Sequence, residues 1–475
     1  MIADLKPYAA YKDSGLPWLG QVPAHWAICK PRHIGILLKG VGGTKEDALP
    51  EGVPCIRYGE LYTTYSYFIR QPKAFIHPDR ASSYTPLRYG DVLFAASGES
   101  LEEIGKSAVN LIEGPAVCGG DVIVLRPSIE VYAPFLGYAL ECRPSVVQKA
   151  TMGRGTTVKH IYPDELKNLL FSLPPLAEQA AIVRFLDWAN GRLERAIRLK
   201  RKTIALLNEQ KQAIIHRAVT RGLDPDAPLK DSGIPWLGEI PQHWEVRKLK
   251  FEMSFRGGGT PSKGNPAFWN GSIPWVSPKD MKSDVIRDTE DHITERAVAE
   301  SSTNLVPAGS LLMVVRSGIL QRSIPVAMCN REVALNQDMK ALTSKGRIDL
   351  EYFVLFVRGC EKRLLRVWTK QGATVESVEH QYLVNTKVPI PPIGEQRLIV
   401  RQLAVEIEPQ TNTISRLERE IALLREYRTR LVADVVTGKL DVREAAARLP
   451  DEAPLPDAAD ADETDLELVD GAEDP

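Results

Sequence analysis

Three short segments of this sequence carry residue types that could support catalysis, but each lacks part of the required arrangement. The segment at 97–107 ends in the Gly-Lys-Ser of a phosphate-binding loop, yet Ser100 stands where the first glycine of that motif belongs. PDELK at 163–167 groups carboxylates with a lysine as some nucleases do, but within one turn at the start of a helix. NPAF at 265–268 loosely suggests a base-flipping methyltransferase, and no glycine-rich cofactor loop accompanies it. We therefore expect no catalytic residues.

The cysteines and the hydropathy pattern argue against several further classes. None of the six cysteines forms a CxxC pair or a Cys/His cluster with zinc-like spacing, so we expect reduced thiols and no bound metal. The N-terminus lacks an apolar signal core, and no run approaches the ~18 apolar residues of a membrane helix. A content of 44% hydrophobic and 25% charged residues is typical of a soluble globular protein. We expect a cytoplasmic protein without membrane contact.

Charge is unevenly distributed along the chain. The formal net charge is −1, but residues 451–475 contain eleven Asp or Glu and no Lys or Arg, so basic residues exceed acidic ones by ten in the first 450. Such an excess is compatible with a polyanionic partner. The acidic end of the chain is rich in Ala, Asp and Pro, which predicts a disordered tail.

An internal repeat organises the chain. The segment YKDSGLPWLGQVPAHW, which begins at Tyr11, returns as LKDSGIPWLGEIPQHW from Leu229, 218 residues later. A second block, PPLAEQAAIVRFL from Pro174, returns as PPIGEQRLIVRQL from Pro391 at an offset of 217. Two segments that keep this spacing indicate that one unit of about 218 residues has been duplicated.

The repeated PWLG segments contain tryptophans for which packing or docking of a partner subunit is favoured over base stacking. Each second tryptophan follows a histidine, His25 or His243, and a single histidine beside a tryptophan is seldom catalytic. The four candidate docking residues are Trp18, Trp26, Trp236 and Trp244.

Each copy of the repeat contains a mixed region followed by a long helix. The mixed regions, 31–173 and 249–390, combine β-branched runs with frequent Gly and Pro, which predicts short strands and turns with some helix. The helical blocks carry apolar residues at alternating spacings of three and four, which predicts a coiled-coil seam. This seam is expected at Ile182, Leu186, Ala189, Leu193, Ile197, Ile204, Leu207, Ile214 and Ala218, and at Ile399, Leu403, Ile414, Leu417, Ile421, Leu424, Leu431 and Val435.

The predicted fold is α+β, with two mixed α/β domains separated by a long antiparallel coiled coil of two helices and a pseudo-twofold internal duplication. The boundaries are 1–173 for the first domain, 174–222 for the first helix, 223–390 for the second domain, 391–441 for the second helix and 442–475 for the tail. Because the second helix leaves the second domain, it packs on the first helix only by running back antiparallel. Each helix is on the order of 60 Å long, enough to bridge DNA half-sites roughly 34–36 Å apart.

Several motifs, taken in order, closely resemble those of the specificity subunits of Type I restriction–modification systems. They are GGTPSKGNPAFWNGSIPWVSPKDM at 258–281, ALNQDM at 334–339, GATVESVEHQYLVNTKVPIPP at 372–392 and the twice-used PP-xx-EQ-xx-IV opening of the helices. The resemblance covers nearly all of residues 11–441. It implies two target-recognition domains, each reading one half of a bipartite site in double-stranded DNA, in a chain that supplies recognition without catalysis.

The same resemblance implies partners and their cofactors. The long helices would set the spacing between the domains and dock two methyltransferase subunits, and motor-nuclease subunits would join for restriction. S-adenosylmethionine, ATP and Mg²⁺ would be bound by those partners, and no cofactor by this chain.

Polar residues in the turns of the mixed regions are the candidate DNA contacts, because phosphate contacts position a protein while base-edge contacts specify sequence. An Arg suits guanine, and a Glu or Asp can accept a hydrogen bond from cytosine. In the first domain the candidates are Thr44, Lys45, Arg57, Tyr58, Glu60, Ser97, Gly98, Glu99, Arg154 and Thr156. In the second domain they are Thr260, Ser262, Lys263, Ser277, Lys279, Asp280, Arg316, Ser317, Lys370, Gln371 and Thr374. For each, an ordinary loop-surface position is the alternative.

Two other functions remain open at this level. One is a scaffold whose coiled coil assembles partners while its globular domains no longer read DNA. The other, less favoured because the catalytic motifs are incomplete, is a self-contained DNA-modifying enzyme.

Overall fold

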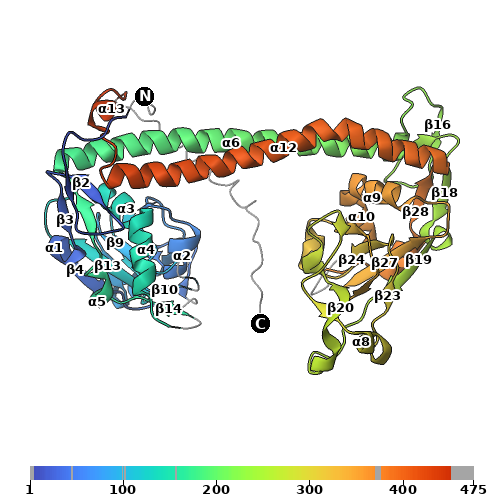
Figure 1. The fold of residues 1–475 in the computed structure, drawn as a ribbon, viewed down its shortest axis with the longest axis horizontal. Helices are drawn as coiled ribbons and strands as arrows, with labels where there is room; N and C mark the ends of the chain where they lie inside the picture. The colour runs from blue at the N-terminus through green and yellow to red at the C-terminus, as the bar shows by residue number, and fades with distance from the viewer. Residues whose placement is uncertain are drawn as a thin grey trace. The chain divides into compact units, whose positions relative to one another are not determined.

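The computed structural model describes residues 5–43, 47–98, 100, 103–155, 158–369 and 376–450 (Figure 1). The chain forms two compact units: unit 1 comprises Met1–Lys200 with Arg419–Pro475, and unit 2 comprises Arg201–Glu418. Two long helices, α6 (Leu176–Arg221) and α12 (Ile393–Val436), each contribute residues to both units. The predicted acidic tail at 451–475 lies outside the described residues.

Unit 1 contains a five-stranded sheet in the order β4-β13-β9-β11-β6. All neighbouring strands in it are antiparallel except β11 and β6, which run parallel. The runs VLFA and VIVL are buried along their whole length, as expected for strands covered on both faces. The strands are β4 (Gly35–Lys39), β13 (Val122–Pro127), β9 (Val92–Ala95), β11 (Ser107–Asn110) and β6 (Phe68–Ile69).

A second sheet of unit 1 has the order β7-β5-β12-β8, in which only β5 and β12 are parallel. Its strands are β7 (Phe75–Ile76), β5 (Val53–Ile56), β12 (Ala116–Cys118) and β8 (Thr85–Leu87). Three short pairs join β1 (Tyr11–Asp13) to β2 (Gln21–Pro23), β3 (Ala27–Cys29) to β15 (Phe171–Leu173), and β10 (Ser97–Gly98) to β14 (Lys159–His160). The shorter helices are α1 (Pro31–Ile34), α2 (Tyr58–Thr63), η3 (Pro78–Ser83), α3 (Ala133–Glu141), α4 (Arg143–Met152), α5 (Pro163–Leu166) and α13 (Arg443–Ala447).

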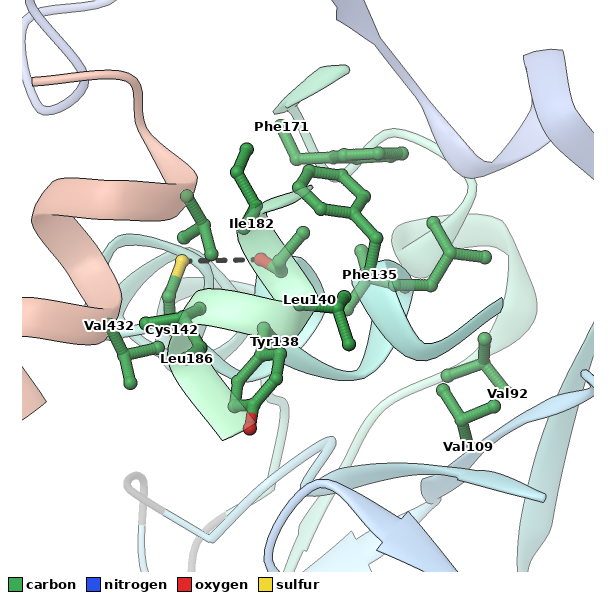
Figure 2. Packing of buried hydrophobic residues seen from close by; sticks show 14 of the residues in the cluster. Val92, Val109, Phe135, Tyr138, Leu140, Cys142, Phe171, Ile182, Leu186 and Val432 are labelled. Atoms are coloured by element: carbon green, nitrogen blue, oxygen red, sulfur yellow. Dashed lines mark hydrogen bonds between the residues drawn. The ribbon is translucent and has the colours of Figure 1, made fainter. Parts of the chain in front are cut away.

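The main core of unit 1 is shared by the five-stranded sheet, α3 and the long helices. Figure 2 shows sheet residues such as Val92 and helix residues such as Phe135 and Ile182 in this cluster. Val432 of α12 belongs to the same core. The end of the second long helix therefore completes a domain whose sheet is encoded more than 300 residues earlier.

Unit 2 repeats this topology. Its sheets have the orders β19-β27-β24-β25-β21 and β22-β20-β26-β23, with the same strand directions as in unit 1. The place of β10 and β14 is taken by a single bridge between Arg316 and Ser377. The prediction of a duplication is confirmed, and it extends through the mixed regions, whose sequences match only weakly.

The elements of unit 2 have the following bounds. The strands are β16 (Leu229–Asp231), β17 (Glu239–Pro241), β18 (Glu245–Lys248), β19 (Met253–Gly257), β20 (Trp269–Val276), β21 (Val285–Ile286), β22 (His292–Ile293), β23 (Leu305–Val306), β24 (Leu311–Val314), β25 (Val326–Cys329), β26 (Val333–Leu335), β27 (Met339–Ser344) and β28 (Lys387–Ile390). The helices are α7 (Leu249–Glu252), η4 (Pro266–Phe268), η5 (Pro278–Asp280), α8 (Glu295–Glu300), η6 (Gly318–Gln321), α9 (Leu350–Gly359), α10 (Glu361–Trp368) and α11 (His380–Asn385).

Helix α6 spans Leu176–Arg221 and helix α12 spans Ile393–Val436, where the sequence analysis placed helices at 174–222 and 391–441. In unit 1, Glu194 of α6 pairs with Arg428 of α12, and Lys200 pairs with Glu420. Partner numbers fall as numbers along α6 rise, so the helices run antiparallel, as predicted. Every predicted seam position is buried or half-buried, which confirms the heptad pattern.

Two further properties of the helices are an internal proline and their hydropathy. Helix α12 continues through Pro409, although an internal proline removes one backbone hydrogen bond. Among the described residues, no helix combines the length and the apolarity that crossing a membrane requires.

Candidate nucleic-acid interface

The polar segments predicted to contact DNA gather at one edge of the sheets in unit 2. Strands β19 and β24 end at the edge where the antiparallel β27 begins, and the parallel strands β20 and β26 end together. The short turn 336–338 leads from the end of β26 to the start of β27, so both sheets present their loops at the same place. We call residues 258–263, 277–280, 315–317, 336–338 and 376–377 the loop edge of unit 2.

Unit 1 has an equivalent loop edge. The same topology brings together the ends of β4, β5, β9 and β12 and the start of β13. Its described residues are 40–43, 57–60, 96–98, 119–121 and 158–160. Two polar surfaces with the same backbone plan and different sequences are therefore present in one chain.

Close packing of the strand ends requires glycine at one equivalent position in each unit. A Cβ atom on Gly258 would lie 2.0 Å from the carbonyl oxygen of Asn336, and one on Gly40 would lie 2.1 Å from that of Gly119. No other residue fits such distances without backbone movement. These glycines therefore set the shape of the loop edges.

The first predicted segment of unit 2 lies at this edge, where Thr260 is half-buried and Ser262 and Lys263 are exposed. The Thr260 hydroxyl donates a hydrogen bond to Oε1 of Gln337, which joins the segment to the turn 336–338. The carbonyl oxygen of Ser262 accepts a hydrogen bond from Trp269 Nε1 at 3.1 Å. Lys263 is exposed and makes no hydrogen bond or ion pair with the described residues. Its ammonium group is available to an anion.

Arg316 and Ser317 follow β24 and have different surroundings. The Arg316 Nε atom donates to Asp338 Oδ1 at 2.5 Å, and the side chain is 53% exposed. The Ser317 N–H donates to the carbonyl oxygen of Glu376 at 3.2 Å, and its hydroxyl caps η6 by accepting from Ile319 N–H. Arg316 thus presents a guanidinium at the surface, whereas Ser317 serves the backbone.

The segment after β20 is internally satisfied. Asp280 Oδ2 accepts from both the backbone N–H and the hydroxyl of Ser277, each at 2.8 Å, and Ser277 is buried. Lys279 Nζ lies 2.9 Å from Glu290 and 3.0 Å from Asp291, and its hydrogen bonds to these carboxylates raise its pKa. Lys279 is therefore less available to a phosphate than Lys263.

The corresponding segment of unit 1 has the same local geometry. Glu60 Oε2 accepts a hydrogen bond from the Arg57 backbone N–H at 3.4 Å, as Asp280 does from Ser277, and burial raises the pKa of Glu60. Tyr58 is exposed and its ring packs edge-on to Tyr62 at 6.0 Å. Of this set, Tyr58 offers the largest free surface to a ligand.

Ser97 and Gly98, which form β10, are buried at the loop edge of unit 1. The Ser97 hydroxyl lies 3.0 Å from Nδ1 of His160, whose residue is exposed, and the Ser97 carbonyl accepts a hydrogen bond from the Tyr62 hydroxyl. The exposed side chain at this place is His160, which the sequence analysis did not select. Arg154, on the adjoining bridge to His160, is exposed and pairs with Glu165 at 2.7 Å.

Seven of the predicted contact residues lie outside the described residues. They are Thr44, Lys45, Glu99, Thr156, Lys370, Gln371 and Thr374.

Several other polar residues at or beside the loop edges were missed by the sequence analysis. Besides His160, Gln337 and Asp338 lie at the edge of unit 2 through the turn 336–338; the motif ALNQDM carried the signal, but only as part of a family resemblance. Lys340 Nζ lies 3.1 Å from His380 Nδ1. Burial lowers the pKa of Lys340, and burial together with Lys340 lowers that of His380.

The three catalysis-like segments have structural partners of their own. Lys106 of the Gly-Lys-Ser sequence pairs with Glu141 at 2.9 Å, and Lys167 of PDELK pairs with Asp164 at 2.6 Å. The side chain of Asn265 in NPAF accepts from the backbone N–H of Ala267 and caps η4. Within the described part of the chain, no group of three His, Cys, Asp or Glu side chains could hold a metal ion.

The repeated PWLG and EQ motifs meet at the start of each long helix. Trp26 Nε1 donates to Glu178 at 3.0 Å, and His25 Nε2 lies 2.6 Å from the same carboxylate. Trp244 and His243 contact Glu395 in the same way, at 3.0 and 2.8 Å. We call these groups the helix-start clusters.

The helix-start clusters bury two of the four tryptophans. Trp26 and Trp244 are completely buried, so they pack inside their units and offer no surface for docking. Trp18 is 37% exposed and Trp236 is half-buried. Of the four tryptophans, these two keep part of their surface exposed.

Comparisons with known proteins agree on one family. A protein-family profile described as "Type I restriction modification DNA specificity domain" matches residues 45–209 and 241–422. The chain is 37% identical to the Type I restriction enzyme EcoR124I/EcoR124II specificity subunit of Escherichia coli over 252 residues, which are 52% of this chain and 56% of that protein. It is 24% identical to the putative Type I restriction enzyme MjaX specificity subunit of Methanocaldococcus jannaschii, over 90% of this chain and 96% of that protein.

A solved structure shares the fold. That solved structure is described as "Structural basis underlying complex assembly and conformational transition of the type I R-M system". The similarity covers 87% of this chain and 98% of that chain, with 18% identity and a TM-score of 0.63.

Proposed function

Because this chain belongs to the family of Type I restriction modification DNA specificity proteins, we propose that each of its units recognises one half of a bipartite site in double-stranded DNA. The observation that carries this proposal is the pair of loop edges. The same strand topology gathers polar turns at one edge of each unit, but the side chains there differ. Two readers with one backbone plan and different side chains suit a site whose halves differ in sequence.

We further propose that this chain directs catalytic partners and performs no catalysis itself. Its similarity to proteins named specificity subunits of Type I restriction enzymes supports methyltransferase and motor-nuclease subunits as those partners. S-adenosylmethionine, ATP and Mg²⁺ would then be bound by the partners, in the cytoplasm. Trp18 and Trp236, the more accessible tryptophans of the repeated segments, are our candidates for subunit docking.

Methylome sequencing of a host with and without this gene tests the proposal. Expression together with the methyltransferase subunit should add one bipartite methylated motif, and deletion should remove it. An unchanged methylome under confirmed expression of both proteins would contradict the proposal. It would favour instead a scaffold that assembles partners without reading DNA.

Exchange of one unit tests the assignment of half-sites. Replacing residues 31–173 by the corresponding region of another family member should change one half of the motif and leave the other half intact. A change in both halves would contradict the proposal that each unit reads its half-site independently.

Removing one heptad from each of α6 and α12 should shorten the gap between the halves of the motif. An unaltered gap would contradict a spacer role for these helices.

A further inference from the structure

Backbone hydrogen bonds align the two loop edges residue by residue, where the sequence alone does not. The Ile161 N–H donates to the carbonyl oxygen of Ala96 at 2.9 Å, and the Val378 N–H donates to that of Val315 at 2.8 Å. The neighbouring residues are paired in both units: Ser97 with His160 in unit 1, and Arg316 with Ser377 in unit 2. Ser97 and Arg316 therefore occupy equivalent positions.

A second pair of hydrogen bonds places an aspartate beside each of these positions. The Ala96 N–H donates to the carbonyl oxygen of Asp121 at 2.9 Å, and the Val315 N–H donates to that of Asp338 at 2.8 Å. The two aspartates immediately precede the equivalent strands β13 and β27. The aspartate is thus common to both units, whereas the residue beside it is Ser97 in one and Arg316 in the other.

The aspartate has a different role in each unit as a result. Asp338 holds Arg316 through Nε, at 2.5 Å. Asp121 is exposed and its carboxylate makes no hydrogen bond or ion pair with the described residues. Only unit 2 therefore carries a guanidinium that is braced at this position.

The brace leaves the other end of the guanidinium available. Neither Nη1 nor Nη2 of Arg316 donates to any group in the described part of the chain, and the side chain is 53% exposed. Holding Nε restricts the torsions of a long side chain, so less conformational entropy is lost when the terminal nitrogens bind a ligand. Two parallel N–H donors match the O6 and N7 acceptors that guanine presents in the major groove.

We propose that Arg316, braced by Asp338, reads a guanine in the half-site recognised by unit 2. This assignment rests on the proposed function and adds to it the identity of one base. The equivalent position of unit 1 holds Ser97, so unit 1 has no guanine reader at this place.

The test uses the full chain assembled with its methyltransferase subunits and a duplex carrying the motif found by methylome sequencing. Each guanine of the unit 2 half-site is replaced in turn by 7-deazaguanine, which lacks the N7 acceptor. One replacement should weaken binding by roughly 5- to 150-fold for the unaltered chain. The same replacement should have little further effect on Arg316→Ala, because the variant has already lost the contact.

Two further variants separate reading from folding. Asp338→Asn keeps the guanidinium but weakens its brace, and should lower the discrimination at the same guanine without changing the rest of the motif. Arg296→Ala is the matched control, because Arg296 is also exposed, at 61%, and ion-paired with a carboxylate, Glu300, in unit 2. Arg296→Ala should keep the full sensitivity to 7-deazaguanine.

The results that overturn the proposals differ. A unit 2 half-site without guanine, or Arg316→Ala with undiminished sensitivity to every replacement, would overturn the assignment of Arg316 while the bipartite motif still supported the proposed function. Absence of any bipartite motif for the unaltered chain would overturn both.

Discussion

The helix-start clusters and the loop edges are both duplicated in this chain, but they have diverged to different degrees. In the helix-start clusters a tryptophan and a histidine contact one glutamate, with matching distances around Glu178 and Glu395. At the loop edges the backbone pairing is also matched, yet Ser97 stands opposite His160 in one unit and Arg316 opposite Ser377 in the other.

This difference follows from where the side chains lie. A buried tryptophan whose N–H must be satisfied accepts few replacements, because its volume and its hydrogen bond are both fixed by neighbours. Arg316 and His160 are exposed at the loop edges, and an exposed side chain can change without disturbing the backbone hydrogen bonds that hold the strands in place. The chain thus combines a shared interior with two separate surfaces, and each prediction below tests one part of that contrast.

The largest effect should come from the buried tryptophans. Trp26→Ala and Trp244→Ala should each lower the stability of their unit by about 3–5 kcal/mol, because each removes a completely buried ring from a core. Trp18→Ala, at a 37% exposed position, should cost less than about 1 kcal/mol. Hydrogen exchange, measured segment by segment along the chain, gives the stability of each unit separately. A small cost for Trp26→Ala would contradict the interior role of the cluster.

A buried ion pair behind the loop edge of unit 1 should give the next largest effect. Lys149, completely buried, donates to Glu141 at 2.8 Å and to the carbonyl oxygen of Gly105 at 2.7 Å. The equivalent of Glu141 in unit 2, 217 residues later, is Arg358. Glu141→Gln should therefore destabilise unit 1 alone, by about 3 kcal/mol, because it leaves Lys149 buried without a counter-charge.

The same carboxylate predicts a pH dependence. Burial acts to raise the pKa of Glu141, but the charges of Lys149 and Lys106 outweigh it, so the pKa lies below its ordinary value of 4.5. A carboxyl group whose pKa is lower in the folded state than in the unfolded state stabilises the fold at pH values above its unfolded-state pKa. That stability is lost as the pH falls through its folded-state pKa. Unit 1 should lose stability below about pH 4.5 more steeply than the Glu141→Gln variant. Equal acid sensitivity of the two proteins would exclude this pair as the cause.

The helix-start glutamates should show a smaller and unequal effect. Glu178→Ala should cost about 1–3 kcal/mol because Trp26 Nε1 loses its buried acceptor, and Glu395→Ala should cost less. The reason is exposure: the Glu178 side chain is 10% exposed and also meets Arg443, whereas Glu395 is 22% exposed. Denaturant unfolding followed by hydrogen exchange gives both costs, and Glu178→Gln, which retains an acceptor, is the control. Equal costs in the two units would contradict the burial argument.

The long helices and the duplication could be predicted from the sequence because their signals are repetitive. Heptad spacing marks the seam, and an identical offset marks the two copies. The strand topology of the mixed regions could not be predicted, because short β-branched runs do not specify which strands pair. Arg316 could be selected as a polar residue after a strand, but its contact with Asp338 depends on the antiparallel pairing of β24 with β27. His160 was missed for the same reason, since only its pairing with Ser97 brings it to the loop edge.

Burial and ion pairing were two further properties that the sequence did not provide. Ser97 and Gly98 follow an apolar strand and were expected in an exposed turn, but they form β10, which pairs with β14 and is buried. Lys279 was selected as a candidate DNA contact, although Glu290 and Asp291 supply two carboxylates that pair with it.

The smallest effect distinguishes two lysines at the loop edge of unit 2. Lys263 is exposed without a partner among the described residues, while Lys279 lies within 3.0 Å of two carboxylates. A lysine that contacts a phosphate releases about one counterion, so Lys263→Gln should lower the slope of log affinity against log salt by about 1. Lys279→Gln should change that slope by much less, because its charge is already balanced within the protein. Salt titrations of DNA binding measure both variants. Equal changes in slope would show that DNA displaces the carboxylates from Lys279. The local ion pairs of the loop edge would then not limit which lysine side chains contact the DNA phosphates.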